Sequence, residues 1–178
     1  MAVVVVMGVS GCGKSTIAGL LAEERGWDLL EGDQLHPPEN IAKMSAGIPL
    51  ADEDRWPWLA AVAAWIRERS AVGADAVVSC SALKRAYRDR LRGGSPEGEV
   101  VFAHLDGPCD VLAERMAHRA HFMPASLLDS QLADLERLGP DEPGLVVDLR
   151  QSPQEQAAAI LSWLGREQKT QKSRGQAR

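Results

Sequence analysis

Cysteine is scarce in this chain of 178 residues, which contains three of them, Cys12, Cys80 and Cys109. Their number is odd and their spacing matches no metal-binding pattern, so the sequence favours a reduced, cytoplasmic protein over a disulfide scaffold or a zinc domain. Long apolar runs are also missing, since the run at residues 3–7 is far too short to span a bilayer. No charged leader precedes a long apolar region, so we expect neither a membrane protein nor a secreted one.

An excess of positive charge is likewise absent from most of the chain. The net charge of the chain is −5. Residues 166–178 hold five Lys or Arg and one Glu, a charge of +4, so the remaining residues carry −9. An acidic body argues against nucleic acid as a partner. The segment 166–178 is rich in Gln and Lys and almost free of apolar residues. We therefore expect a single domain over residues 1–165, followed by a disordered basic tail.

The most specific feature that is present is a glycine-rich stretch directly after the apolar run. Residues 8–15 read Gly-Val-Ser-Gly-Cys-Gly-Lys-Ser, the pattern of a phosphate-binding loop between a strand and a helix. Glycines let successive N–H groups face phosphate oxygens, and the helix start adds the positive end of its dipole. We expect Lys14 to reach the β- and γ-phosphates and the Ser15 hydroxyl to ligate Mg²⁺. The predicted nucleotide-binding residues are Gly8, Val9, Ser10, Gly11, Cys12, Gly13, Lys14, Ser15 and Thr16.

Apolar β-branched runs alternate with helical patterns along the rest of the chain. The patterns predict strands at residues 3–7, 27–30, 76–80, 100–105 and 145–148, and helices at 14–25, 37–46, 52–72, 84–91, 109–119, 125–138 and 153–165. Strands joined by helical crossovers form a parallel sheet that is covered on both faces. The predicted fold class is therefore α/β, with ligands bound at the carboxyl ends of the strands.

Polar residues beyond the loop indicate the acceptor of a phosphoryl group. Asp33 follows the second strand, where a carboxylate can accept the proton of an attacking hydroxyl or hold that hydroxyl in line, although it could also cap a turn. Arg55 begins a helix among carboxylates, and Lys84 and Arg88 are four residues apart on one expected helix face. These three cations suit a carboxylate-bearing acceptor, but spacing alone fits ordinary surface ion pairs as well.

Two tryptophans lie close to these charged residues. Trp56 and Trp58 are two positions apart on the same expected helix. We therefore expect one of them to pack inward, as part of the core or of a pocket wall, while the other stays partly exposed; stacking on a sugar is the alternative role.

Together, these stretches resemble the gluconate kinase (gluconokinase) family, which phosphorylates D-gluconate at its 6-hydroxyl. The matching stretches are residues 7–16, 32–44, 47–59, 80–92 and 121–136, and the likeness extends over about 3–160. The sequences Gly-Asp-Gln-Leu-His-Pro at 32–37 and Cys-Ser-Ala-Leu-Lys at 80–84 are its most specific parts. Shikimate and adenylate kinases share the phosphate loop but differ from this chain at both places.

The resemblance implies a phosphate-loop nucleoside triphosphate hydrolase fold of the nucleoside-monophosphate-kinase-like type, with a five-stranded parallel sheet. A helical substrate section would cover residues 36–70 and a mobile lid residues 117–124. ATP and Mg²⁺ would be the cofactors and D-gluconate the substrate, and, because the family is commonly dimeric, a homodimer is implied. The gluconate pocket would be lined by Asp33, His36, Arg55, Lys84, Arg88 and His121. The catalytic residues would be Lys14, Asp33, Arg115 and Arg119, the two arginines reaching over the phosphates as the lid closes.

The chain departs from related enzymes at two places. Ala120 stands where family members usually have Gly, which would strain the lid hinge if that position needs a positive φ. Cys80 and Ser81 stand at the end of the third strand, where many phosphate-loop enzymes place an Asp that organises Mg²⁺. We expect Glu31 or Asp33 to replace that Asp and to reach Mg²⁺ through water.

Two alternative functions stay open on the sequence alone. One is a kinase of the same fold that acts on another small acceptor, such as a different sugar acid or shikimate. The other is a nucleotide-binding regulatory protein without turnover, against which the presence of Lys14, Ser15, Asp33, Arg115 and Arg119 argues.

Overall fold

The computed structural model describes residues 2–96, 98–117 and 126–176, and its centre is a parallel sheet of five strands. The strands are β1 (Val3–Met7), β2 (Asp28–Glu31), β3 (Ala76–Ser79), β4 (Val100–Asp106) and β5 (Gly144–Asp148). Their order is β2-β3-β1-β4-β5, and every pairing is parallel. The predicted α/β class and five-stranded sheet are thereby confirmed.

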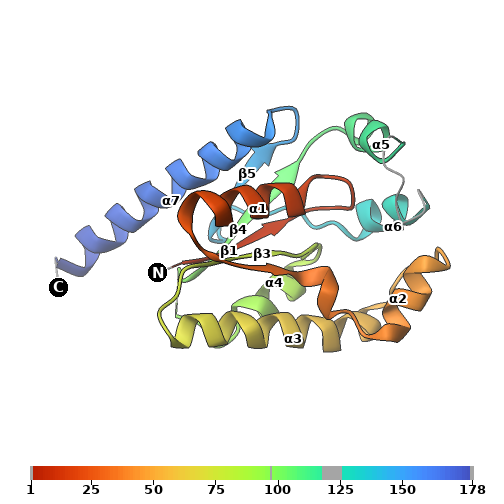
Figure 1. Ribbon diagram of the computed structural model, residues 1–178, viewed down its shortest axis with the longest axis horizontal. Coiled ribbons are helices and arrows are strands. Elements are labelled where there is room, and N and C mark those ends of the chain that lie inside the picture. The colour runs from red at the N-terminus through yellow and green to blue at the C-terminus, as the bar shows by residue number, and fades with distance from the viewer. Residues whose placement is uncertain (1, 97, 118–125, 177–178) are drawn as a thin grey trace.

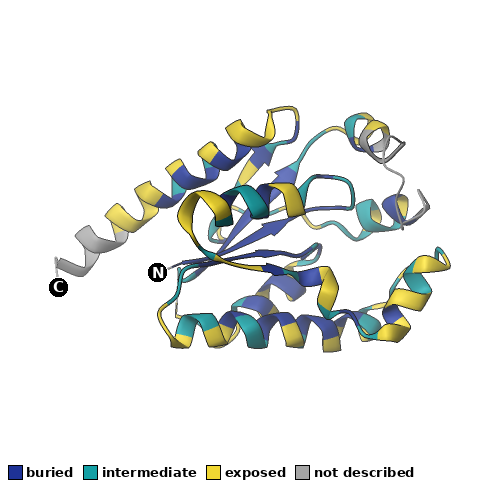
Figure 2. Cartoon of the chain, viewed as in Figure 1, coloured by how far each residue is buried: buried dark blue, intermediate teal, exposed yellow. Residues whose placement is uncertain are grey.

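Helices cover both faces of this sheet (Figure 1). On one face lie α1 (Lys14–Arg25) and α7 (Pro153–Gln176), and on the other lie α3 (Asp52–Ala71) and α4 (Arg85–Arg92). All residues of β1 and β3 are buried between these layers, as Figure 2 shows. A strand that is buried on both faces needs no polar alternation, which explains the continuous Val-rich run of β1.

Three further helices lie at the side of the sheet where the strands end (Figure 1). They are α2 (Pro38–Ser45), α5 (Cys109–Ala117) and α6 (Ser126–Asp134). A short 3₁₀ helix, η1 (Gly32–Leu35), connects β2 with α2 and was not predicted. The carboxyl edge of the sheet is therefore surrounded by short elements, as expected for the ligand-binding side of a doubly wound fold.

Several predicted boundaries differ from the structure by one to four residues, and backbone hydrogen bonds explain two of these differences. The second strand begins at Asp28 rather than at Trp27, whose N–H donates to the Ala22 carbonyl at 3.1 Å and closes the end of α1. Helix α6 ends at Asp134 rather than at 138, because the Glu136 N–H donates to the Leu83 carbonyl at 2.9 Å. In both places a backbone donor is used by a cap or a neighbouring loop, so it cannot extend the predicted element.

The C-terminal helix is longer than predicted. The sequence pattern predicts its end at 165, whereas α7 continues to Gln176. The segment expected to be a disordered tail is therefore helical up to that residue. Its Gln, Glu, Lys and Arg residues are good helix formers, and Thr170 Oγ1 donates to the Arg166 carbonyl at 3.1 Å. Within the described part of the chain, no helix combines the length and apolar character needed to cross a membrane.

Candidate active site

The phosphate loop leaves β1 at Gly8 and enters α1 at Lys14. Gly8 has a φ of +140°, and a Cβ there would lie 2.7 Å from the Leu105 carbonyl oxygen. Gly13, directly before α1, has a φ of +100°, which L side chains rarely adopt. Lys14 Nζ donates to the Val9 carbonyl at 3.0 Å, so the ammonium group folds back over the loop. The first N–H groups of α1 have no intrahelical acceptors, as an anion-binding helix start requires.

A carboxylate from the neighbouring strand reaches the start of α1. Ser15 Oγ donates to Glu31 Oε2 at 2.9 Å, and Ser79 Oγ donates to the same oxygen at 2.5 Å. Glu31 ends β2 and pairs with Ser79 of β3 in the sheet register. Hydroxyl and carboxylate oxygens are the ligands that Mg²⁺ prefers. The structure thus places Glu31 beside Ser15, where the prediction needs an acidic residue.

A cleft opens beside the loop at the carboxyl ends of the strands. It is lined by Ser10 and Lys14 of the loop and by three of the residues predicted to bind the acceptor, Asp33, His36 and Arg55. The other lining residues come from α2, the α2–α3 connection, α3, the loop after β3 and α6. They are Met44, Pro49, Leu50, Trp58, Ser81, Leu83, Leu127, Ser130 and Gln131. The phosphate loop and three of the residues predicted to bind the acceptor therefore line one cavity.

His36 is held in a defined orientation at the wall of this cleft. Its ring stacks on Trp58 with centroids 4.1 Å apart. Asn40 Nδ2 lies 3.2 Å from His36 Nδ1 and donates to the Asp54 carbonyl at 2.8 Å. An amide nitrogen only donates, so Nδ1 is the acceptor and the proton of the neutral ring is on Nε2, which faces Asp33 Oδ1 at 3.9 Å. Burial lowers the pKa of His36, which favours this neutral form.

Arg55 lines the cleft from within a network of hydrogen bonds. Its Nη1 donates to the Tyr87 hydroxyl at 2.8 Å and to Asp134 Oδ2 at 2.7 Å. Behind it, Lys84 Nζ donates to Asp52 Oδ1 at 2.8 Å, and the Tyr87 hydroxyl donates to the same oxygen. The hydrogen bonds from Lys84 and then Tyr87 lower the pKa of Asp52. Lys84, predicted to line the gluconate pocket, is not among the residues that line this cleft and instead pairs with Asp52.

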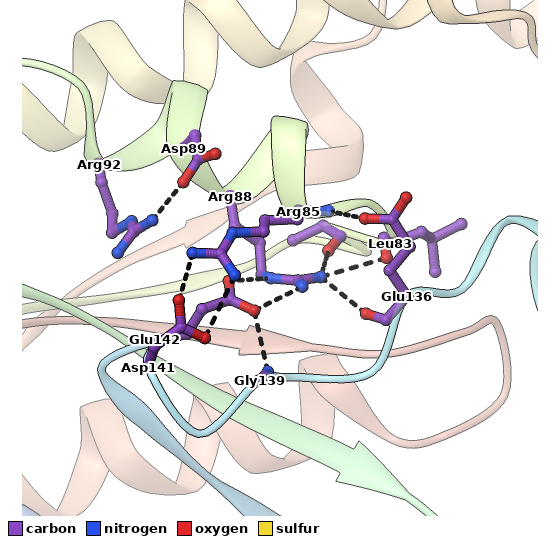
Figure 3. Close-up of polar contacts among 10 residues, drawn as sticks. Leu83, Arg85, Arg88, Asp89, Arg92, Glu136, Gly139, Asp141 and Glu142 are labelled. Atoms are coloured by element: carbon purple, nitrogen blue, oxygen red, sulfur yellow. Dashed lines mark hydrogen bonds and ion pairs between the residues drawn. The ribbon is translucent and has the colours of Figure 1, made fainter.

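Arg88 does not line the cleft either, and the prediction for this residue was wrong. Its side chain is fully buried, and its Nε and Nη2 donate to the two carboxylate oxygens of Glu142 at 2.6 and 2.8 Å. Its Nη1 donates to the backbone carbonyls of Ala82, Leu83 and Glu136 at 3.1, 3.2 and 2.9 Å. Figure 3 shows the guanidinium between the labelled Leu83, Glu136 and Glu142. Arg88 therefore joins the loop after β3 to the segment that follows α6.

The prediction failed because of where α4 begins. Lys84 has an extended backbone, with φ −97° and ψ 150°, and the helix starts one residue later, at Arg85. The two cations are therefore not on one helix face. Arg88 instead lies with Tyr87 and Leu91 among the buried residues of α4.

Several predicted site residues fall outside what the structure describes. Arg119, His121 and Ala120 belong to the undescribed segment 118–125, which also contains nearly all of the predicted lid. Arg115 falls within α5. Their expected roles stay predictions.

The structure brings residues to the site that the sequence did not indicate, among them Gln131 and Ser79. Gln131 Oε1 accepts a hydrogen bond from the Ser10 N–H of the phosphate loop at 2.6 Å. It lies in the stretch 121–136 that carries the family resemblance, but an uncharged amide has no spacing that marks it. Ser79 reaches Glu31 only through the sheet register, which a sequence does not show. Trp58, expected as a core or pocket-wall residue, is 2% exposed and lines the cleft, whereas Trp56 is 38% exposed.

The fold and this site together define a small-molecule kinase of the phosphate-loop class. A family model described as "AAA domain" matches residues 3–138. The chain is 53% identical over 150 residues to the gluconokinase of Gluconobacter oxydans (strain 621H), with 84% of this chain and 83% of the relative covered. It therefore belongs to the gluconokinase family, which confirms the resemblance found in the sequence.

Solved structures agree with this assignment. A crystal structure of a gluconokinase from Sinorhizobium meliloti 1021 superposes with a TM-score of 0.87 at 50% identity and covers 97% of both chains. An unliganded sugar kinase from Janibacter sp. HTCC2649 superposes with a TM-score of 0.88 at 56% identity, covering 93% of this chain and 95% of that one.

Proposed function

We propose that this protein transfers the γ-phosphoryl group of ATP to the 6-hydroxyl of D-gluconate, giving 6-phospho-D-gluconate and ADP. The observation that carries the proposal is one cleft lined both by Lys14 of the phosphate loop and by Asp33, His36 and Arg55. Relatives named as gluconokinases support the choice of acceptor. Gluconate carries one carboxylate, for which the planar guanidinium of Arg55 is a suitable partner.

Asp33 is the residue suited to act on the attacking hydroxyl. Its side chain is 66% exposed on η1, so it is accessible to a ligand in the cleft. The hydroxyl oxygen forms the new bond to the γ-phosphorus, the bond to the β–γ bridging oxygen breaks, and ADP leaves. The hydroxyl proton passes to Asp33, either during this step or after it. Lys14 stabilises the charge of the transferred phosphoryl group.

Mg²⁺ fits the oxygen atoms at the start of α1. The described residues contain no group of three or more His, Cys, Asp or Glu that could hold a metal ion. A divalent ion here would therefore be bound by Ser15, the phosphates and water, with Glu31 acting through water. When bound, Mg²⁺ neutralises charge on the phosphate oxygens.

The rest of the proposal extends the family resemblance. Arg115 and Arg119 would stabilise charge on the phosphates, and His121 would contact gluconate as the lid closes. A homodimer in the cytoplasm is proposed on the same basis.

A coupled assay of ADP release tests the proposed reaction. Mg-ATP would be supplied with D-gluconate and, in parallel, with shikimate, glycerate, glucose and nucleoside monophosphates. We expect turnover that is selective for gluconate. Turnover with another acceptor would keep the ATP site but overturn the acceptor, and nucleotide binding without any turnover would favour a regulatory protein.

A further inference from the structure

Two N–H groups of the phosphate loop are held by residues of the acceptor cleft. The Gly8 N–H donates to the Ser81 carbonyl at 3.2 Å, and the Ser10 N–H donates to Gln131 Oε1 at 2.6 Å. Ser81 and Gln131, which accept these two hydrogen bonds, both line the cleft. The first of these bonds joins two backbones, whereas the second depends on one side chain from α6, 121 positions away in the sequence. The conformation of the loop at Ser10 therefore depends on a helix outside the nucleotide motif.

Ser10 lies on the acceptor side of the loop, because it shares the cleft with Asp33. A nucleotide that lies along the loop must present its terminal phosphoryl group to that side if the group is to reach an acceptor. The Ser10 segment is thus the part of the loop that meets the terminal phosphoryl group, rather than the part near Ser15 at the start of α1.

We propose that Gln131 is a positioning residue. By accepting a hydrogen bond from the Ser10 amide, it fixes the conformation in which the phosphate loop binds the terminal phosphoryl group of the nucleotide. This inference rests on the proposed function, which places the nucleotide on the loop and the acceptor at Asp33. A neutral amide oxygen suits the task because it accepts the hydrogen bond without placing a negative charge beside the phosphates.

The position of Gln131 on α6 also links the nucleotide side of the cleft to the acceptor side. Asp134, three residues later on the same helix, accepts the hydrogen bond from Arg55 at 2.7 Å. Residues three apart lie on one helix face, so the same face of α6 contacts the phosphate loop through Gln131 and Arg55 through Asp134. Leu127 and Leu128 are buried and fix the helix in this position.

Two variants and one control test the inference. Gln131→Met keeps the approximate length of the side chain but removes the acceptor, and Gln131→Glu keeps an acceptor but adds a negative charge. Asp129→Asn, at an exposed position of α6, is the matched control. Affinities for ADP and for a non-hydrolysable ATP analogue would be measured with Mg²⁺ and without any acceptor, followed by kcat and KM.

We expect Gln131→Met to weaken binding of the ATP analogue about tenfold and to leave ADP binding within about twofold, since one hydrogen bond at the terminal-phosphoryl end is lost. Gln131→Glu should weaken analogue binding further through charge repulsion. The kcat should fall about tenfold in Gln131→Met while KM for gluconate stays nearly constant. The control should match the wild type in each measurement.

Equal losses for ADP and the analogue, or no loss, would overturn the inference, because a merely structural role does not distinguish the two nucleotides. Gln131→Ala, which removes the same hydrogen-bond acceptor, provides the same comparison if Gln131→Met does not fold. Because these affinities need no acceptor, they test Gln131 even if gluconate proves not to be the substrate. Failure of the proposed function would instead appear as absent gluconate turnover in the wild type.

Discussion

At the scale of single residues, Asp33 is the group on which the proposed chemistry depends. It lies beside a neutral His36 whose Nε2 faces it at 3.9 Å. We expect Asp33→Asn to lower kcat about 100-fold, because the amide cannot accept the hydroxyl proton, and to raise KM for gluconate by a smaller factor. Steady-state kinetics at saturating ATP measures both. An unchanged kcat would remove Asp33 from the chemical step.

Glu31 provides a second test at this scale, because it is expected to affect the binding of Mg²⁺ rather than that of the phosphoryl acceptor. Its carboxylate accepts hydrogen bonds from Ser15 and Ser79. We expect Glu31→Gln to raise the Mg²⁺ concentration needed for half-maximal activity about tenfold, as loss of an outer-sphere partner does. Glu24→Gln, exposed on α1, is the control for a general loss of negative charge. If both variants need the same Mg²⁺ as the wild type, Glu31 does not take part.

The candidate site could be predicted from sequence where one continuous stretch builds it. The phosphate loop needs only the order of its glycines, Lys14 and Ser15, so the motif was sufficient. Contacts between distant stretches were not predictable, because they depend on sheet order and on where helices begin. Glu31 meets Ser79 through strand register, and Arg88 is turned to the protein interior because α4 starts after Lys84.

At the scale of elements, the ion pair of Arg88 and Glu142 joins α4 to the segment before β5. Both side chains are 1% exposed, so removing one would leave the other charged and buried without its partner. We expect Arg88→Met to lower the free energy of unfolding by about 3–5 kcal/mol. Urea denaturation, followed by circular dichroism, measures the loss.

A matched control for this prediction lies on the same helix. Arg85 pairs with Asp141, and their side chains are 49% and 59% exposed. Solvent screens such a pair, so Arg85→Met should change stability little. Equal destabilisation by the two substitutions would mean that burial of the Arg88 pair does not determine its contribution.

Element boundaries show the limit of local patterns at this scale. The helix start at Lys14 was predicted correctly, because Gly13 and the loop before it define that start in the sequence. The early end of α6 and the late start of β2 were missed, since the Glu136 and Trp27 N–H groups donate to carbonyls outside the elements predicted to contain them. The extension of α7 was missed because its polar composition was interpreted as disorder, although the same residues have good helix propensity.

At the scale of the whole molecule, the doubly covered sheet makes stability depend on pH through a histidine. His104 of β4 is fully buried, and in the part of the chain that the structure describes neither of its ring nitrogens has a hydrogen-bond partner. Burial lowers the pKa of His104 below the ordinary value of 6.5. As the pH falls through 6.5, the unfolded chain therefore takes up a proton that the folded protein does not, and the free energy of unfolding decreases.

Replacing His104 should remove this acid-sensitive contribution from the whole fold. We expect the free energy of unfolding of His104→Val to fall less steeply than that of the wild type below pH 6.5, while the difference above that pH stays constant. His104→Gln is the control for packing, because it keeps a buried polar group but cannot titrate. Urea denaturation across the pH range should give the two variants equal slopes, although their absolute stabilities differ. If all three proteins gave parallel curves, other groups would account for the acid sensitivity of the fold. Among the described residues, His36 is another buried histidine with a lowered pKa.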